Sequence, residues 1–481
     1  MIGLIQNDER LESDIRDLIY AFYFGEKIKK VEDMSDQYDL YVKVEVTGDQ
    51  VAFSLIKEEN IISHVTCDSL LRNPVKESMY KLLSHATGKE LPWGTLTGVR
   101  PTKIALEKIE QGCKREEIEQ YFHDTFHCTD QKVDICIRVA ENENRILESM
   151  NYKEQYSLYI GIPFCPTTCL YCSFTSYPIS MYRKRVDEYL DALFEEIDYV
   201  KEACKDKQLI SVYFGGGTPT SIEAPQLKRL IEKVKESFDF TYVQEFTVEA
   251  GRPDSITREK LDVLKECGVT RISINPQTMN QETLKLIGRA HTVEQTIEAF
   301  KLAREAGHDN INMDMIVGLP GEDISHVRKT LDMIRELKPD SLTVHSLAVK
   351  RAANLNIQME KYRASLKGAT NEMLELVDEY AAELGLSPYY LYRQKNIPGN
   401  MENVGYAKPG LESIYNILIM EEKQDIIALG AGASSKFVFY DENRIERAEN
   451  VKNVDHYIGR VDEMIARKKA FMEDKYRHDQ L

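Results

Sequence analysis

Residues 159–174 of the chain are Tyr-Ile-Gly-Ile-Pro-Phe-Cys-Pro-Thr-Thr-Cys-Leu-Tyr-Cys-Ser-Phe. This stretch overlaps a strand-like run, Leu158–Ile162, and Pro163 and Pro166 keep its second half out of a regular helix. Its cysteines have the spacing C-x₃-C-x₂-C and are Cys165, Cys169 and Cys172. Three thiolates on one loop suit a cubane iron–sulfur cluster, which normally takes four cysteines. We therefore predict a [4Fe–4S] cluster at this loop, with its fourth iron open to another ligand.

Two alternatives to a cluster stay open at this point. The chain has nine cysteines in all, so three of them could be neighbours by chance. A zinc site is the second alternative, although zinc sites usually show two C-x₂-C pairs or added histidines, and neither is near. The remaining cysteines are isolated in the sequence and are expected to be buried or inert thiols: Cys67, Cys113, Cys128, Cys136, Cys204 and Cys267.

The composition is that of a soluble globular protein of two or three domains. The chain has 481 residues, of which 42 % are hydrophobic and 29 % charged, and no apolar run approaches membrane-spanning length. Met1–Arg10 lacks the basic start and apolar stretch of a signal peptide. Together with the clustered free thiols, this leads us to expect a cytoplasmic protein, and we expect a monomer. The net charge of −17 disfavours a nucleic-acid or anionic-membrane surface, but an acidic small substrate needs only a local basic pocket.

The order of expected elements divides the chain into three regions. Residues 1–152 are expected to form an N-terminal α+β accessory domain, because strand-like alternation over 40–46 and 51–56 predicts a hairpin, with helical segments after it. Residues 153–353 are expected to form the core barrel. Residues 354–481 are expected to form a small C-terminal α+β domain that covers the substrate.

The most distinctive stretch of the N-terminal region is Trp93–Lys103. It contains the only tryptophan, two glycines, a proline and two cations. It is either a tight loop around a core tryptophan, or a segment whose Arg100 and Lys103 face an anionic ligand or dock this domain over the cluster.

Strand-like and helix-like segments alternate through the central region, which predicts an α/β fold with a parallel sheet curled into a partial (β/α)₆-type barrel. The expected strands are 158–162, 210–214, 245–250, 271–275, 310–316 and 342–347. Helical patterns between them cover 184–205, 224–237, 258–267, 293–306 and 324–337. In such folds the site lies at the carboxyl ends of the strands, and the cysteine loop follows the first strand at that end.

Two of these strands have polar residues along one face, which is unusual in a buried parallel sheet. Those residues are Glu245, Thr247 and Glu249 in one strand and Asn310, Asn312 and Asp314 in the other. We expect the apolar faces to pack under the outer helices and the polar faces to line a hydrophilic lumen. The alternative is that the polar groups satisfy one another within a filled barrel. Glu249 and Asp314, near the strand ends, fit that alternative least.

The loop after the second strand begins with three successive glycines, Gly215–Gly217, and continues to Thr220. Glycines let a ligand approach the backbone and leave N–H groups pointing outward, which suits the carboxylate or amine of an amino acid. The same residues could also form only a turn.

Further motifs follow the cysteines in a fixed order. Glu249 ends the third strand in Glu-Phe-Thr-Val-Glu-Ala, and Gln277 follows the fourth in Ser-Ile-Asn-Pro-Gln. Arg289 lies in Ile-Gly-Arg-Ala-His, and Asp314 lies in Asn-Met-Asp-Met-Ile-Val-Gly-Leu-Pro-Gly. With the cysteine stretch and Gly-Gly-Gly-Thr-Pro-Thr, this order resembles the radical S-adenosylmethionine (SAM) superfamily. Within it, the chain resembles the oxygen-independent coproporphyrinogen III oxidase (dehydrogenase) family, in the branch with an extra N-terminal domain, over residues 159–437.

The resemblance implies which residues bind the cofactors. The three cysteines of the loop would hold the cluster, and the methionyl amine and carboxylate of SAM would bind the open iron. The pocket for one or two SAM molecules would be lined by Tyr159, Tyr171, Gly216, Gly217, Thr218, Glu249, Gln277, Arg289, Asp314 and Ala348. Lys436 would lie near the second SAM or the substrate. Of these residues, Tyr159, Glu249 and Arg289 are predicted to be catalytic.

The resemblance also implies an activity. A reduced cluster would split SAM into methionine and a 5′-deoxyadenosyl radical, which would take a hydrogen from the β-carbon of a propionate side chain. Loss of carbon dioxide and one electron would leave a vinyl group. Two such events convert coproporphyrinogen III to protoporphyrinogen IX in oxygen-independent haem biosynthesis. A donor such as flavodoxin or ferredoxin would supply the electron that reduces the cluster.

One position departs from the pattern of the coproporphyrinogen-converting members. They often carry a fourth cysteine two positions after the third, where this chain has Phe174. Members that resemble haem chaperones also have Phe at this position. The alternatives are therefore a haem-binding chaperone on the same scaffold, or a radical SAM haem methyltransferase or degradation enzyme.

The C-terminal region offers candidates for binding a tetrapyrrole. Tyr389–Asn400 is aromatic and basic. It could hold a flat macrocycle, with Arg393 and Lys395 on its carboxylates, or it could pack its tyrosines as a strand of a small domain. Lys350 and Arg351, just after the last barrel strand, are further candidates for propionates.

Overall fold

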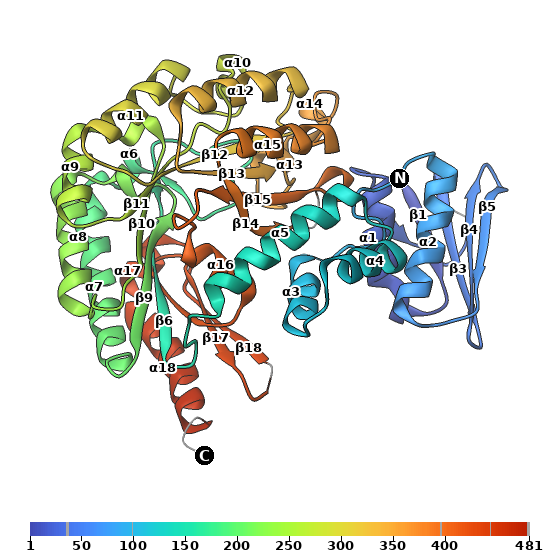
Figure 1. The fold of residues 1–481 in the computed structure, drawn as a ribbon, viewed down its shortest axis with the longest axis horizontal. Coiled ribbons are helices and arrows are strands. Elements are labelled where there is room, and N and C mark those ends of the chain that lie inside the picture. Colours follow the sequence, from blue (N-terminus) through green and yellow to red (C-terminus); the bar gives the residue numbers. More distant parts are fainter. Residues whose placement is uncertain (35–37, 99, 395–396, 443, 479–481) are drawn as a thin grey trace.

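The computed structural model describes residues 1–34, 38–98, 100–394, 397–442 and 444–478, and its strands form two main sheets (Figure 1). The smaller sheet has the order β2-β1-β3-β4-β5 and is packed against two helices, α1 and α2. The predicted hairpin is the antiparallel pair β3–β4, so that prediction is confirmed. The bounds are β1 Ile2–Gln6, α1 Glu12–Phe22, β2 Ile28–Lys30, β3 Leu40–Thr47, β4 Gln50–Lys57, β5 Asn60–Cys67 and α2 Arg72–Thr87.

The stretch that begins at Trp93 connects this sheet to the rest of the molecule. Trp93 is fully buried, and its indole N–H donates to Glu402 at 2.7 Å, so the core-tryptophan interpretation is confirmed. Arg100 donates to the carbonyl of Met420 at 2.7 Å and pairs with Glu422 at 2.9 Å. Arg100 therefore attaches this segment to the end of a C-terminal helix and not to the cysteine loop. Three helices follow: α3 Thr102–Glu110, α4 Arg115–Phe126 and α5 Asp130–Leu147.

The larger sheet contains the predicted barrel strands as neighbours in one parallel set. Its order is β14-β15-β13-β12-β11-β10-β9-β6-β16-β17-β18. The six strands from β6 to β13 are all parallel, as predicted, and their bounds differ from the expected ones by at most three residues. They are β6 Gln155–Ile162, β9 Gln208–Gly216, β10 Glu245–Gly251, β11 Arg271–Ile274, β12 Ile311–Val317 and β13 Ser341–Ser346.

Five C-terminal strands extend this same sheet at both edges. On one side β15 runs antiparallel to β13, and β14 runs antiparallel to β15. On the other side β16 runs parallel to β6, with β17 and β18 antiparallel beyond it. The domain boundary at residue 353 stays a prediction, and the strands on its two sides share one sheet. Their bounds are β14 Ser387–Arg393, β15 Glu402–Ala407, β16 Asp425–Leu429, β17 Ser434–Phe439 and β18 Arg444–Glu449.

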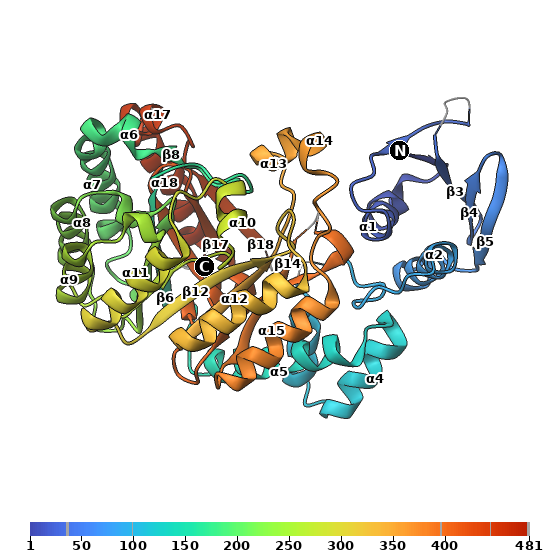
Figure 2. The same ribbon diagram turned by 90° about the horizontal axis from the view of Figure 1, so that it is seen from above.

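Helices cover the outer face of the parallel strands (Figures 1 and 2). The α-helices between the barrel strands are α6 Ile179–Tyr182, α7 Val186–Ala203, α8 Ala224–Ser237, α9 Arg258–Glu266, α10 Gln281–Leu286, α11 Val293–Glu305 and α12 Ile324–Leu337. The C-terminal part adds α13 Asn354–Ile357, α14 Met359–Tyr362, α15 Asn371–Glu383, α16 Ile414–Glu421, α17 Val454–Gly459 and α18 Val461–His478. In the described part of the chain, no helix combines the length and apolarity that crossing a membrane requires.

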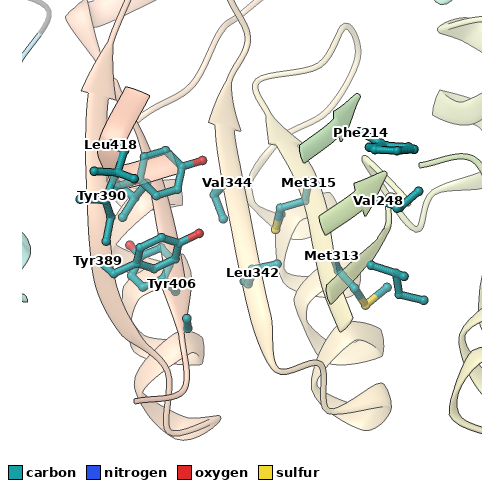
Figure 3. Packing of buried hydrophobic residues seen from close by; sticks show 14 of the residues in the cluster. Phe214, Val248, Met313, Met315, Leu342, Val344, Tyr389, Tyr390, Tyr406 and Leu418 are labelled. Carbon is teal, nitrogen blue, oxygen red and sulfur yellow. The ribbon is translucent and has the colours of Figure 1, made fainter. Parts of the chain in front are cut away.

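The apolar core runs from the barrel strands into the C-terminal strands without a break (Figure 3). Met313 and Met315 of β12 pack beside Leu342 and Val344 of β13, and the tyrosines of β14 and β15 continue the layer. Every second residue of the parallel strands points into this core, as the alternating pattern predicts.

The aromatic stretch after residue 388 belongs to that core. Tyr389 is 0 % exposed and Tyr390 5 % exposed in β14. Arg393 is buried, donates to the carbonyl of Leu96 at 2.7 Å and lies over the ring of Trp93. The idea that this stretch holds a macrocycle, with Arg393 on its carboxylates, is therefore wrong for these three residues. Lys395 lies outside the described residues.

Two buried carboxyl groups face each other where α5 meets α16. Glu143 is 0 % exposed, and neither of its carboxyl oxygens has a partner in the described part of the chain. Burial raises the pKa of Glu143 well above its ordinary value, and a charge on Glu421 raises it further. Lys423 and Arg100 act in the opposite direction. Burial therefore favours the protonated form of Glu143.

This arrangement makes stability depend on pH. A carboxyl group whose pKa is higher in the folded than in the unfolded state stabilises the fold when it is protonated. This contribution is complete below the ordinary pKa of the group, and it is lost as the pH rises through the pKa of the folded state. We expect Glu143→Gln to raise the melting temperature at pH 9 by about 2 °C or more, and to change it little at pH 5. The control is the exposed Glu141→Gln on the same helix. Parallel pH profiles for wild type and Glu143→Gln would contradict this assignment.

Candidate active site

The cysteine loop is attached to the neighbouring strand by backbone hydrogen bonds. The N–H of Gly217 donates to the carbonyl of Ile162 at 2.8 Å, and the N–H of Thr218 donates to the carbonyl of Phe164 at 2.7 Å. These bonds continue the pairing of β6 and β9 into the short strand β7 (Phe164–Cys165). The expectation that these N–H groups point outward to a ligand is therefore wrong, because they hold the cysteine loop.

Glycine is needed where the loop after β9 meets the cysteine loop. A Cβ at Gly217 would lie 2.6 Å from the carbonyl oxygen of Phe164 and 3.0 Å from the sulfur of Cys165. Gly216 has φ +106°, a backbone conformation that L side chains rarely adopt. Next to them, the hydroxyl of Thr218 lies 3.4 Å from the Cys165 sulfur. Of the predicted residues, Gly217 and Thr218 thus lie directly against the first cysteine, and Gly216 lies against Ile162.

Arg252 fixes the second half of the cysteine loop. It is only 3 % exposed, and its Nη1 donates to the carbonyl and hydroxyl oxygens of Thr167 at 3.0 and 2.8 Å. The same nitrogen lies 3.7 Å from the Cys169 sulfur, while Nε and Nη2 donate to Asp254 at 2.9 and 2.7 Å. Sequence reasoning missed this positioning residue. Its only signal is an arginine in the turn Gly-Arg-Pro-Asp after the third strand.

The three cysteines fit a cubane cluster. All nine cysteines of the chain are free thiols. The pKa of Cys165 is raised to about 11, mainly by burial and to a smaller extent by charges on Cys172 and Cys169. Among the described residues, no three His, Cys, Asp or Glu side chains form a set that could hold a single metal ion. A cubane instead takes its thiolates on separate iron atoms, and free thiols on one loop supply that donor set.

Buried polar atoms without partners gather at the carboxyl ends of the strands beside this loop. In the described residues they include Ser273 Oγ, Asn275 Oδ1, Gln277 Oε1 and Arg289 Nε. Each unpartnered buried group costs about 1–3 kcal/mol, so several in one place indicate a ligand. The amine, carboxylate and ribose hydroxyls of SAM are polar groups of the kind that would satisfy them.

Gln277 has the least favourable backbone among the predicted site residues. Its φ is +64°, a value that is uncommon outside glycine. The conformation is held by two backbone bonds, from its N–H to the carbonyl of Asp314 at 2.9 Å and from the N–H of Ile316 to its own carbonyl at 2.8 Å. Backbone strain of this kind is found at functional sites, where the surrounding structure maintains it.

Arg289 connects the residues at the strand ends to the cysteine loop. Its guanidinium is 6 % exposed, donates to the carbonyl of Asn275, and lies against the Tyr171 hydroxyl and the Cys169 sulfur. Both neighbours favour its charged form. Arg289 is therefore in contact with two predicted site residues of a loop that is distant from it in the sequence.

Glu249 and a stack of three tyrosine rings form the opposite wall. The Tyr213 hydroxyl donates to Glu249 at 2.6 Å. Burial raises the pKa of Glu249 to about 7, with the Tyr213 hydrogen bond acting in the opposite direction. The Tyr213 ring is stacked 4.4 Å from Tyr415 of α16 and 6.2 Å from Tyr159. The Tyr213 and Tyr415 contributions were not identified from the sequence.

Deeper in the lumen, several polar side chains are bonded to one another, whereas Asn310 Oδ1 and Arg271 Nε have no partner among the described residues. Glu245 accepts from the Thr247 hydroxyl at 2.6 Å, from the Ser413 hydroxyl at 2.9 Å and from the N–H of Tyr415 at 3.0 Å, so it caps α16. The Asn312 amide donates to Asp314 at 2.6 Å. The filled-barrel interpretation therefore holds for Glu245, Thr247, Asn312 and Asp314, and the ligand-facing lumen stays a prediction.

The last two predicted residues lie in different places. Ala348 follows β13 next to Lys350, whose ammonium lies 5.2 Å from the centre of the exposed Phe174 ring beside the cysteine loop. Lys436 in β17 donates to the carbonyl of Ile419 at 2.9 Å and pairs with Glu422 at 3.0 Å. The structure does not bring Lys436 into contact with the other predicted site residues.

A loop after β16 closes one side of the cysteine loop. Gly430 packs against Gly161, and Gly432 packs against Thr175 so closely that a Cβ would lie 2.4 Å from the threonine hydroxyl. The fully buried Glu196 of α7 holds this loop, because it accepts from the N–H of Gly430 at 2.8 Å and pairs with Lys468 of α18 at 2.6 Å.

Comparison with known proteins assigns the chain to a family. The family model described as Radical SAM superfamily matches residues 159–334. The chain is also 43 % identical over 407 residues to a Bacillus subtilis (strain 168) protein named oxygen-independent coproporphyrinogen-III oxidase-like protein HemZ, and the match covers 84 % of this chain and 81 % of that protein. The chain belongs to the oxygen-independent coproporphyrinogen III oxidase-like family of the radical SAM superfamily. The family predicted from the motifs is thereby confirmed.

Other members of this family have different names. The Bacillus subtilis heme chaperone HemW is 34 % identical over 313 residues, covering 64 % of this chain and 76 % of that protein. The solved structure of Escherichia coli coproporphyrinogen III oxidase (HemN), described as a radical SAM enzyme, matches this chain with a TM-score of 0.52 and 25 % sequence identity. The match covers 66 % of this chain and 71 % of that one. Membership in the superfamily implies a [4Fe–4S] cluster and SAM as cofactors, and the cysteine loop and the unpartnered polar atoms fit both groups.

The contact of Gly217 with the cysteine loop can be tested by adding one methyl group. We expect Gly217→Ala to displace the loop at a cost of about 1–3 kcal/mol and to lower the iron content of the reconstituted protein. The control is Gly459→Ala, where an added Cβ meets nothing within 4 Å. Iron analysis and the visible absorption of the cluster measure the result, and equal iron in both variants would show that the contact is unimportant.

Proposed function

We propose that the protein is a radical SAM oxidoreductase that converts two propionate side chains of coproporphyrinogen III to vinyl groups, giving protoporphyrinogen IX without oxygen. The observation that carries this proposal is the set of unpartnered buried polar atoms beside a loop of three free thiols, at the carboxyl ends of the barrel strands. The 43 % identity to an oxygen-independent coproporphyrinogen-III oxidase-like protein supports the choice of substrate.

The roles of the site residues follow from their positions. Cys165, Cys169 and Cys172 would hold the cluster, and the other predicted residues at the carboxyl ends of the barrel strands would bind SAM. When bound and reduced by a donor such as flavodoxin or ferredoxin, the cluster and SAM would supply the radical that removes a hydrogen atom from a propionate β-carbon, with carbon dioxide leaving and one electron passing to a one-electron acceptor.

The protein's own groups position these components and exclude water. Arg252 orients the cysteine loop, and Arg289 brings a fixed positive charge to the same place. Glu249 would accept hydrogen bonds from an amine or a hydroxyl when ionised, with the Tyr213 hydroxyl fixing its orientation. The stacked rings of Tyr159, Tyr213 and Tyr415 lie next to Glu249 as one wall of the site.

A haem-binding chaperone is the second candidate, and one residue favours it. Phe174 is 69 % exposed beside the cysteine loop, under the ammonium of Lys350. An exposed aromatic ring with a neighbouring cation could contact the face and a carboxylate of haem. The 34 % identity to the heme chaperone HemW agrees with this candidate.

Anaerobic turnover separates the two functions. Cluster-replete protein is incubated with coproporphyrinogen III, SAM and a reductant, and the porphyrin products are separated by chromatography. We expect products with one and two vinyl groups. Haem transferred stoichiometrically to an acceptor protein, with no vinyl product, would establish the chaperone instead.

Removal of one cluster ligand tests the cysteine assignment. We expect Cys169→Ser to lose most of the iron and SAM cleavage, because a neutral hydroxyl replaces a thiolate ligand. Cys204→Ser, at a buried cysteine far from the loop in sequence, should keep both. Iron content and 5′-deoxyadenosine release are the measurements, and SAM cleavage retained in Cys169→Ser is the contrary result.

The pKa of Glu249 predicts how SAM binding depends on pH. Because its pKa is about 7 and the ionised form is the better acceptor, SAM affinity should rise by up to about tenfold between pH 6 and 8. Glu249→Gln should bind SAM more weakly and lose this dependence. Tyr213→Phe removes a hydrogen bond that lowers the pKa of Glu249, so the midpoint of the rise in SAM affinity should move above pH 7. Anaerobic calorimetry measures the affinities, and an unchanged profile in Glu249→Gln refutes the role.

A further inference from the structure

A large cleft separates the N-terminal sheet region from the mouth of the barrel. Its volume is about 1450 Å³, above the roughly 300–1,000 Å³ of ordinary small-molecule pockets. One wall is formed by α1 and the chain from Phe24 to Lys29, and the other is formed by α13, α14 and neighbouring residues. Figure 2 shows α1 facing α13 and α14 across this space. The cleft therefore has room for a macrocycle.

This cleft adjoins the cysteine loop. The N–H of Leu355 in α13 donates to the carbonyl of Leu170, which lies between two of the cluster cysteines, at 2.8 Å. Val349 and Arg351 line the cleft on either side of Lys350, the residue that lies over Phe174. The barrel-side wall of the cleft is therefore attached to the cysteine loop, and the Lys350–Phe174 contact lies one residue from this wall along the chain.

The lining of the cleft is basic in an otherwise acidic protein. Six lysine or arginine side chains line it against three carboxylates, whereas the whole chain has a net charge of −17. Arg351, Lys361 and Arg363, on the barrel side, are exposed. None of these three forms an ion pair with a carboxylate in the described part of the chain. Unpaired cations facing one cleft create a positive field that attracts a polyanion.

The cleft also offers apolar contact surface. Tyr20 and Phe24 line the N-terminal wall, with their rings 5.7 Å apart in an edge-to-face arrangement. Ile357, on the opposite wall, is 72 % exposed. Flat aromatic and aliphatic surfaces with cations around them match a macrocycle that has an apolar body and several carboxylate arms.

We propose that this cleft binds the tetrapyrrole by its propionate carboxylates, and that the N-terminal region serves as its outer wall. The inference rests on the proposed function for the identity of the ligand and adds where it is bound and by which side chains. It gives a role to a part of the chain that lies outside the residues matched by the radical SAM family model. Arg351, Lys361 and Arg363 would hold carboxylates, while Tyr20 and Ile357 would contact the ring.

Charge reversal on the barrel side of the cleft tests this proposal. The full-length protein with its cluster is titrated with coproporphyrin III, the stable oxidised form with four propionates, and binding is followed by porphyrin fluorescence. The triple variant Arg351→Glu, Lys361→Glu and Arg363→Glu is compared with a control of equal charge change on outward-facing helices, Lys201→Glu, Lys301→Glu and Lys329→Glu. SAM cleavage without substrate confirms that the cluster site is intact in both.

We expect the cleft variant to bind coproporphyrin III about tenfold more weakly or worse, and the control to change less than about threefold. Protoporphyrin IX, with two propionates, should be affected less than coproporphyrin III. Affinity of the cleft variant equal to that of the control would overturn the cleft assignment and leave the proposed reaction standing. Wild-type protein that cleaves SAM but binds no coproporphyrin would overturn both, so the two failures are distinguishable.

Discussion

The site depends on the parallel pairing of β6 with β9, whose backbone hydrogen bonds continue past the ends of both strands into the cysteine loop. The register of β6 on β9 sets Gly161 opposite Gly215 and Ile162 opposite Gly216, and the two backbone bonds that follow bring the cysteine loop against Gly217 and Thr218. The position of the first cluster cysteine is therefore set by sheet geometry. The remaining half of the loop has no strand to follow, and a single buried arginine, Arg252, fixes it with two hydrogen bonds to Thr167, while two more bonds hold the arginine on Asp254.

The polar groups of the barrel lumen differ in how completely they are bonded. Glu245 is bonded to Thr247 and to the start of α16. At the strand ends beside the cysteine loop, several polar atoms of the described residues lack partners, and Gln277 keeps a strained backbone. Fully satisfied polar groups stabilise the fold, whereas unsatisfied ones are retained where a ligand completes them.

Much of this could be predicted from the sequence because it is encoded locally. The alternation along each strand showed which side chains enter the lumen, and the cysteine spacing identified the cluster loop. What could not be predicted depends on contacts between distant residues. Arg252 is one of 62 basic residues, and nothing near it in the sequence connects it to the loop 83 residues earlier. For the same reason, the buried pairing of Lys436 with Glu422 and the two-sided extension of the sheet were not foreseen.

That extension has a consequence for biosynthesis. The edge of β6 is completed by β16, more than 260 residues later, and the buried charge of Glu196 is balanced by Lys468 near the end of the chain. A nascent chain that has just released its barrel strands from the ribosome therefore has an open sheet edge and an uncompensated interior carboxylate. Such long-range closure is slow and exposes intermediates to aggregation. The cysteine loop therefore reaches its final surroundings only after β16 and α18 have been synthesised.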